Sequence, residues 1–171
     1  MKNLEQYRGC LIGGAAGDAL GYAVEFPGTD AAVKKYGKSG SKNCKLHNGI
    51  APVSSVTQMT LFTANGLLLG TTRGMTRGIM GSYPAYIAAC YKDWLQTQSA
   101  VYPLRPRSPY SWLVNEPELF ARRDPGNTCI SAIINGADGT IDAPMNQSKG
   151  CGGMVRVAPI GLYLGGRRYE S

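Results

Sequence analysis

Four glycines recur at every fourth position within the apolar segment 4–24, and this spacing constrains the fold more than any other feature of the chain. They are Gly9, Gly13, Gly17 and Gly21. The surrounding apolar residues predict a helix that is hydrophobic on nearly every face. Glycine is costly inside a helix unless its missing side chain lets another backbone come close. We therefore expect this segment to form a central, crowded helix.

The rest of the chain also predicts helices, because no segment alternates polar and apolar residues as a half-buried strand does. An apolar run over 57–69 predicts a second buried helix, and Gly70 suits its C-terminal end. A further helix is expected from a Ser82 cap to Leu95. The remaining expected helices are 116–122, 128–135 between an Asn127 cap and Gly136, and the apolar run after Gly153. The fold class predicted is all-α.

The length predicts one domain. The chain has 171 residues, of which 43% are hydrophobic, enough for one domain with a core but hardly for two. No repeat or linker divides it, so we expect a single compact domain over 1–171, with a Lys- and Gly-rich loop at about 27–52. The apolar N-terminal stretch is short and interrupted by Glu5, Arg8 and Asp18, which argues against a signal peptide or a membrane span.

The cysteines argue against a structural metal. There are five, widely spaced and never in a CxxC pair, beside a single histidine, His47. A structural zinc site is therefore not expected. Unpaired cysteines suit a reducing compartment, so the expected location is the cytoplasm. The five are Cys10, Cys44, Cys90, Cys129 and Cys151.

Positive charge is concentrated in the loop. The chain carries 18 Lys and Arg against 11 Asp and Glu, a formal net charge of +7, which favours anionic partners. The lysine cluster is either a solvated surface loop or a patch for an acidic protein or a nucleic acid. Only Tyr36 interrupts it as an aromatic residue, which speaks against base stacking. The cluster consists of Lys34, Lys35, Lys38, Lys42 and Lys45.

The stretch "VSSVTQMTLF" at 53–62 places three hydroxyls and no acid at the expected start of a helix. These are Ser54, Ser55 and Thr57. They form either an ordinary helix cap or a cation site that lacks its charged ligands. Near the other end of the chain, Gly150, Cys151, Gly152 and Gly153 precede an apolar run. Such a turn either lets backbone N–H groups approach an anion or serves the fold alone.

Taken together, the motifs resemble one family. "RGCLIGGAAGDALGYAVEF" (8–26), "VTQMTLFTANGLLLG" (56–70) and "SKGCGGMVRVAPIGLYLG" (148–165), with "PGNTCISAI" (125–133) between the last two, resemble the ADP-ribosylglycohydrolase family in content and order. The resemblance implies an all-helical enzyme that holds two Mg²⁺ ions and cleaves the glycosidic bond between ADP-ribose and its target. Clustered carboxylates would hold these hard ions, which orient the ribose and activate a water.

The same resemblance shows that the metal-binding aspartates expected of the family are missing from this sequence. Relatives carry a Ser/Thr-Asp-Asp-Thr run before the Gln-Met of this helix. Aligning on "TQMTLF" puts Ser54 on the first hydroxyl and puts the two aspartates on Ser55 and Val56. The late Asp-x-Asp-Thr/Ser motif has no counterpart before Ser171. Without these charges, affinity for Mg²⁺ should collapse. We expect no cofactor, and Mg²⁺ only if the chain is an active hydrolase.

Other motif positions are retained. Asp18 and Glu25 match "GDALG…EF", where the resemblance implies a glutamate near the ribose and an aspartate that supports the site. The alternative for Asp18 is an internal hydrogen-bonding or capping role. Residues 150–153 resemble the loop that lies against the diphosphate or the distal ribose in relatives. The order Met154-Val155 before Arg156 is transposed relative to the family's Val-Met-Arg.

Three functions remain open. The first is a degenerate homologue without hydrolase activity that acts as a binding, inhibitory or regulatory protein. The second is an active magnesium-dependent hydrolase that removes ADP-ribose from protein side chains and uses Glu25 or Asp18. The third is a shortened product with no independent role, whose exposed core would favour association. The expected partners are ADP-ribose or a related nucleotide, an acidic protein or nucleoprotein, and a second copy of the chain; no membrane is expected.

Overall fold

A computed structural model of the chain describes residues 3–25, 30, 33–34, 37, 44, 46–79, 81–104 and 108–165. These residues contain no strand, only an isolated bridge between His47 and Ile50. The predicted all-α fold is confirmed. Most of the predicted loop at 27–52, including Lys35, Lys38, Lys42 and Lys45, lies outside the described residues. The α-helices are α1 (Leu4–Glu25), α3 (Ser55–Arg77), α4 (Tyr83–Thr97), α5 (Asn127–Ile134) and α6 (Ala158–Leu164).

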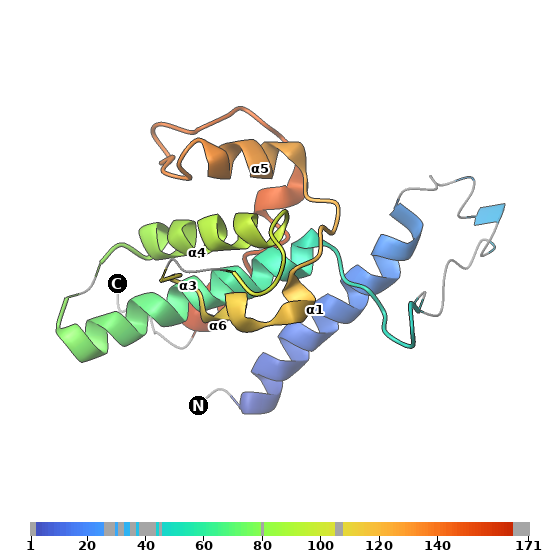
Figure 1. Cartoon of the computed structure of the whole chain (residues 1–171), viewed down its shortest axis with the longest axis horizontal. Coiled ribbons are helices and arrows are strands. Elements are labelled where there is room, and N and C mark those ends of the chain that lie inside the picture. Colours follow the sequence, from blue (N-terminus) through green and yellow to red (C-terminus); the bar gives the residue numbers. More distant parts are fainter. Residues whose placement is uncertain are drawn as a thin grey trace.

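Helices α3 and α4 lie side by side at the centre of the molecule (Figure 1). Two glycines of α3 allow this contact. A Cβ atom on Gly66 would lie 2.6 Å from the Cα atom of Ile87, and one on Gly70 would lie 2.8 Å from the Tyr86 ring. Both distances are shorter than a carbon–carbon contact, so the α4 backbone approaches as closely as it does only because these positions lack side chains.

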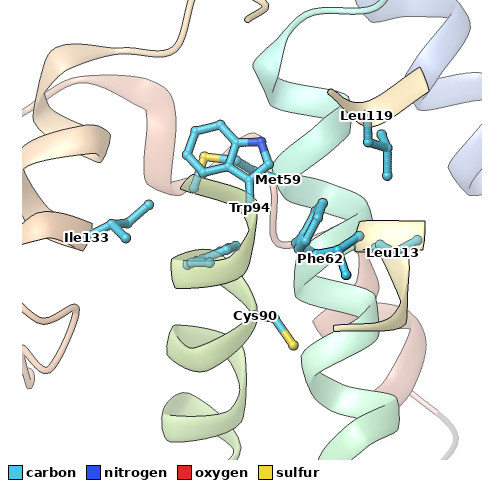
Figure 2. Packing of buried hydrophobic residues seen from close by; sticks show 9 residues of the cluster. Met59, Phe62, Cys90, Trp94, Leu113, Leu119 and Ile133 are labelled. Atoms are coloured by element: carbon cyan, nitrogen blue, oxygen red, sulfur yellow. The ribbon is translucent and has the colours of Figure 1, made fainter. Parts of the chain in front are cut away.

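The hydrophobic core lies between this helix pair and the segments that follow it (Figure 2). Trp94 of α4 is fully buried, and its indole N–H donates to Gln58 Oε1 of α3 at 3.1 Å. Burial raises the pKa of Cys90 to about 12, so this thiol stays protonated and packs as an apolar group. The labelled core residues come from four different parts of the chain: Met59, Phe62, Cys90, Trp94, Leu113, Leu119 and Ile133.

Two element predictions are wrong in their bounds. Helix α3 does not end near Gly70 but continues to a left-handed cap at Gly78, whose N–H donates to Gly74 O at 2.9 Å. Gly70 serves the contact with α4 instead. The N-cap of α5 is Gly126 rather than Asn127. Ser82 does precede α4, but its side chain makes no capping hydrogen bond.

The prediction of a helix over 116–122 is also wrong. This region forms two short 3₁₀ turns, η1 (Trp112–Asn115) and η2 (Pro117–Leu119). The Asp93 carboxylate of α4 accepts from the backbone N–H groups of Tyr110 and Ser111 at 2.7 and 2.8 Å. These tertiary hydrogen bonds hold the start of the segment against α4, and a proline after the first turn prevents a continuous helix.

Helix α1 is not the central helix that its glycines predict. It lies at the edge of the helix pair (Figure 1), and its glycines face open space, since a Cβ atom on any of them would meet nothing within 4 Å. Ala19 is the one buried hydrophobic residue of α1 among those described. The centre belongs to α3 and α4, because their large side chains bury far more apolar area than a glycine-rich helix can. No described helix is both long and apolar enough to cross a membrane.

Candidate functional site

Two groups of predicted site residues, nearly a hundred residues apart in the sequence, line one pocket of about 490 Å³. The first group is Ser54, Ser55 and Val56 at the start of α3. The second is the glycine-rich turn, Gly150, Cys151, Gly152 and Gly153. This turn contains the 3₁₀ element η3 (Cys151–Gly153), which comes just before α6. The fold therefore brings the degenerate metal positions and the candidate ligand loop to one place.

Ser54 is the N-cap of α3. Its backbone is extended, and its Oγ atom accepts from the N–H of Val56 at 3.0 Å. The first turn of α3 contains no acid of its own. A helix N-terminus carries unpaired N–H groups and a partial positive charge, both of which favour a nearby carboxylate.

Asp18 of α1 supplies that carboxylate. Its oxygens accept from the N–H and the Oγ of Ser54 at 2.9 and 2.6 Å, and from the N–H and the Oγ1 of Thr57 at 3.3 and 2.5 Å. Asp18 thus has an internal hydrogen-bonding role at the start of α3, with both oxygens engaged. Glu25 ends α1, and its side chain lies outside the described part of the structure.

A second acid, Asp124, also lies at this pocket, and sequence reasoning missed it. Asp124 lines it, and its carboxylate accepts a hydrogen bond from the Tyr22 hydroxyl of α1. The backbone of Asp124 has a positive φ of 49°. Aspartate tolerates this left-handed conformation better than most residues. An acid directly before Pro125 and Gly126 is a turn signal, and that signal could have directed attention to it.

The donor set at the start of α3 does not fit a pair of Mg²⁺ ions. Mg²⁺ prefers an octahedral shell of oxygens anchored by carboxylates. Among the described side chains, the carboxylates here are Asp18, which binds the N-terminus of α3, and Asp124, which binds Tyr22. Val56 offers no ligand atom. Within the described ranges, no three His, Cys, Asp or Glu side chains gather in a group that could hold a metal ion.

One basic side chain, Arg156, lines the pocket. The guanidinium of Arg156 lies over the Tyr91 ring, 4.9 Å from its centroid, and its Nη1 atom is 3.0 Å from Met59 Sδ and 3.6 Å from Cys129 Sγ. The one ion pair found among the described residues joins Arg8 and Glu5. Arg156 is therefore a half-buried cation whose described neighbours include no carboxylate partner. Sequence reasoning noted this residue only for the transposed order before it.

At one position of the glycine-rich turn, Gly152, the backbone packs closely against a neighbouring side chain. A Cβ atom on Gly152 would lie 3.0 Å from Cys129 Sγ, whereas one on Gly153 would meet nothing within 4 Å. The N–H of Gly150 donates to Ser148 Oγ at 3.2 Å. Gly152 is thus the position in the turn where a side chain would disturb the pocket wall.

Other predicted site residues lie elsewhere. Of the lysine cluster, only Lys34 is described, and it is exposed. A larger hollow of about 1,020 Å³ lies between α4 and residues 136–142 and contains none of the predicted site residues. Asp93 lines it, and burial raises the pKa of this carboxyl. That hollow is separate from the pocket at the start of α3.

The fold and the pocket define an all-helical protein in which a helix N-terminus faces a glycine-rich turn. The sequence model of the family described as ADP-ribosylglycohydrolase matches residues 1–170, and the chain belongs to that family. The resemblance inferred from the motifs is confirmed. Neither the curated proteins nor the solved structures compared with the chain contain a match.

Proposed function

We propose that the protein binds ADP-ribose, or a nucleotide that contains it, without hydrolysing it. The observation that carries this proposal is the single pocket that joins the glycine-rich turn to the start of α3, where Ser55 and Val56 stand in place of the family's aspartates. The proposal assigns recognition to the glycine-rich turn and hydrolysis to the start of α3, where Ser55 and Val56 carry no charge.

The charges around the pocket support an anionic ligand. Arg156 is partly buried and has no carboxylate partner among the described residues. The two acids nearby are engaged, Asp18 with α3 and Asp124 with Tyr22. A half-buried guanidinium is stabilised by an anion, and phosphate oxygens match its geometry. The Ser148 hydroxyl, which lines the pocket and accepts from the N–H of Gly150, still has its own hydrogen to donate to the ribose.

The same chemistry argues against turnover. Hydrolysis at the anomeric carbon needs a group that activates water and a charge that stabilises the reacting centre. Binding alone contributes proximity, but it leaves the water unactivated. The protein would then act as an inhibitory or regulatory factor that sequesters ADP-ribose, and it would need no Mg²⁺.

Calorimetry with ADP-ribose tests recognition. We expect one molecule to bind per chain, with the same Kd in Mg²⁺ and in EDTA. Gly152→Ala should weaken binding about tenfold, because the new methyl group is pressed against Cys129. The control is Gly161→Ala, at an exposed position of α6 where a Cβ atom meets nothing within 4 Å. A Kd above the millimolar range, or one that depends on Mg²⁺, contradicts the proposal.

A hydrolysis assay separates this proposal from the active-enzyme alternative. Purified protein is incubated with ADP-ribosylated arginine or serine peptides and Mg²⁺, and free ADP-ribose is measured. We expect none above the rate without protein. Release that disappears in Glu25→Gln would show that the chain is an active hydrolase.

A further inference from the structure

The larger of the two hollows described above has no part in the proposed function. It has a volume of about 1,020 Å³ and lies between α4 and residues 136–142, which follow α5 (Figure 1). We call it the α4 hollow. It shares no lining residue with the pocket at the start of α3. What it can bind is therefore decided by its own side chains.

A buried carboxylate lines the α4 hollow. Asp93 is 5% exposed, and its Oδ2 atom accepts from the N–H groups of Tyr110 and Ser111. The other oxygen, Oδ1, has no donor among the described residues. Oδ1 is also accessible, because Gln98 Oε1 is the one fully enclosed side-chain oxygen or nitrogen without a partner in that part of the chain. Asp93 thus leaves one unpaired oxygen to the hollow that it lines.

The charges around the α4 hollow favour a cation at this oxygen. A carboxylate that is largely removed from water is stabilised by a positively charged donor. Asp138 and Asp142 also line the hollow at exposed positions, and Lys92 is the one base in the described lining. This lysine forms no ion pair with the acids within the described part of the chain. Three aspartates and one lysine give the lining a formal charge of −2, on a chain of net charge +7.

The shape of the lining favours an elongated organic cation over a metal ion. Among the described residues, no three His, Cys, Asp or Glu side chains come together as metal ligands, so these aspartates are too far apart to hold one ion jointly. The lining is otherwise rich in methyl groups, which can pack against methylene groups of a ligand. They belong to Ala85, Ala88 and Ala89 of α4 and to Ala137 of the facing segment.

We propose that the α4 hollow binds a small aliphatic polyamine, a methylene chain that carries two or more ammonium groups. One ammonium group donates to Oδ1 of Asp93, and the methylene groups lie along the alanines of α4. A second ammonium group lies near the exposed acids, Asp138 and Asp142. An ammonium group suits these positions, because its three donors rotate freely and require no fixed geometry.

Calorimetry of the full chain with spermidine tests this proposal. The measurement is made at about pH 8, where carboxylates are ionised, and in about 0.1 M salt, which screens distant charges. We expect one spermidine molecule per chain with a Kd below about 1 mM. Butylamine carries one ammonium group, as a lysine side chain does, and should bind at least about tenfold more weakly.

Two variants at exposed positions of the lining locate the ligand. Ala85→Leu fills part of the hollow without changing its charge, and Asp138→Asn removes an outer charge. Each should weaken spermidine binding at least about fivefold. The matched control is Glu118→Gln, which removes an exposed acid outside the hollow and should leave the Kd unchanged. Asp93→Asn is less informative, because that carboxylate also holds the segment before η1.

Three outcomes would overturn the proposal. The first is no binding of spermidine up to about 10 mM. The second is a Kd that neither Ala85→Leu nor Asp138→Asn changes, since the ligand would then lie elsewhere. The third is butylamine binding as tightly as spermidine. None of these measurements involves ADP-ribose, so the result is independent of the proposed function.

Discussion

At the scale of single residues, Asp18 accounts for the hydroxyl-rich start of α3. The helix contains no acid in its first turn, yet a carboxylate from α1 accepts four hydrogen bonds there. Charge-assisted hydrogen bonds of this kind are stronger than neutral ones. Asp18 is therefore a structural link between α1 and α3.

Replacing Asp18 should therefore reduce stability. Asp18→Asn keeps the size of the side chain but loses the charge and one acceptor, and we expect a loss of about 2 kcal/mol, the range for hydrogen bonds to charged groups. Urea denaturation measures it. The control Asp142→Asn changes an exposed acid and should remain within about 0.5 kcal/mol of the wild type. Equal stability of the two variants would show that Asp18 contributes little.

At the scale of elements, the contact between α3 and α4 depends on glycine, whereas α1 has glycines without a contact. The difference between them is the presence of a neighbouring helix, not the sequence pattern. Gly66 lies beneath Ile87, and Gly70 lies beneath the Tyr86 ring. Replacing a glycine by alanine should therefore lower stability where a neighbouring helix covers the position, and should be neutral or stabilising where the position is open.

Gly66→Ala should destabilise the protein by about 1–3 kcal/mol, the usual effect of overpacking. A new Cβ atom would lie 2.6 Å from the Ile87 backbone, which cannot move as a flexible side chain could. Gly161→Ala on α6 meets open space and should be neutral or stabilise by up to about 1 kcal/mol. Denaturant midpoints of the two variants compare them directly. A neutral Gly66→Ala would mean that α4 can shift away from α3 at little cost.

At the scale of the whole molecule, the described part of the chain leaves large apolar side chains exposed in several elements. They include Ile12 of α1, Leu68 and Met75 of α3, and Val157 before α6. Association of the chain would reduce this exposure.

Some properties of this protein followed from the sequence by itself. The helical fold class and the family membership could be predicted, because periodicity and motif order are local signals carried by many residues. The absence of aspartates at positions 55 and 56 could also be stated without a structure. The cap at Ser54 was predictable for the same reason, since a hydroxyl before an apolar run bonds to its own helix.

Other properties were decided only by the tertiary structure, because they depend on residues far apart in the chain. The sequence could not show that Asp18 binds α3, that Asp124 and Arg156 line the pocket, or that Asp93 holds the segment before η1. The glycine repeat of α1 predicted a close neighbour, but a spacing does not say which helix provides it. In this chain the large side chains of α3 and α4 occupy the centre, and the glycines of α1 face open space.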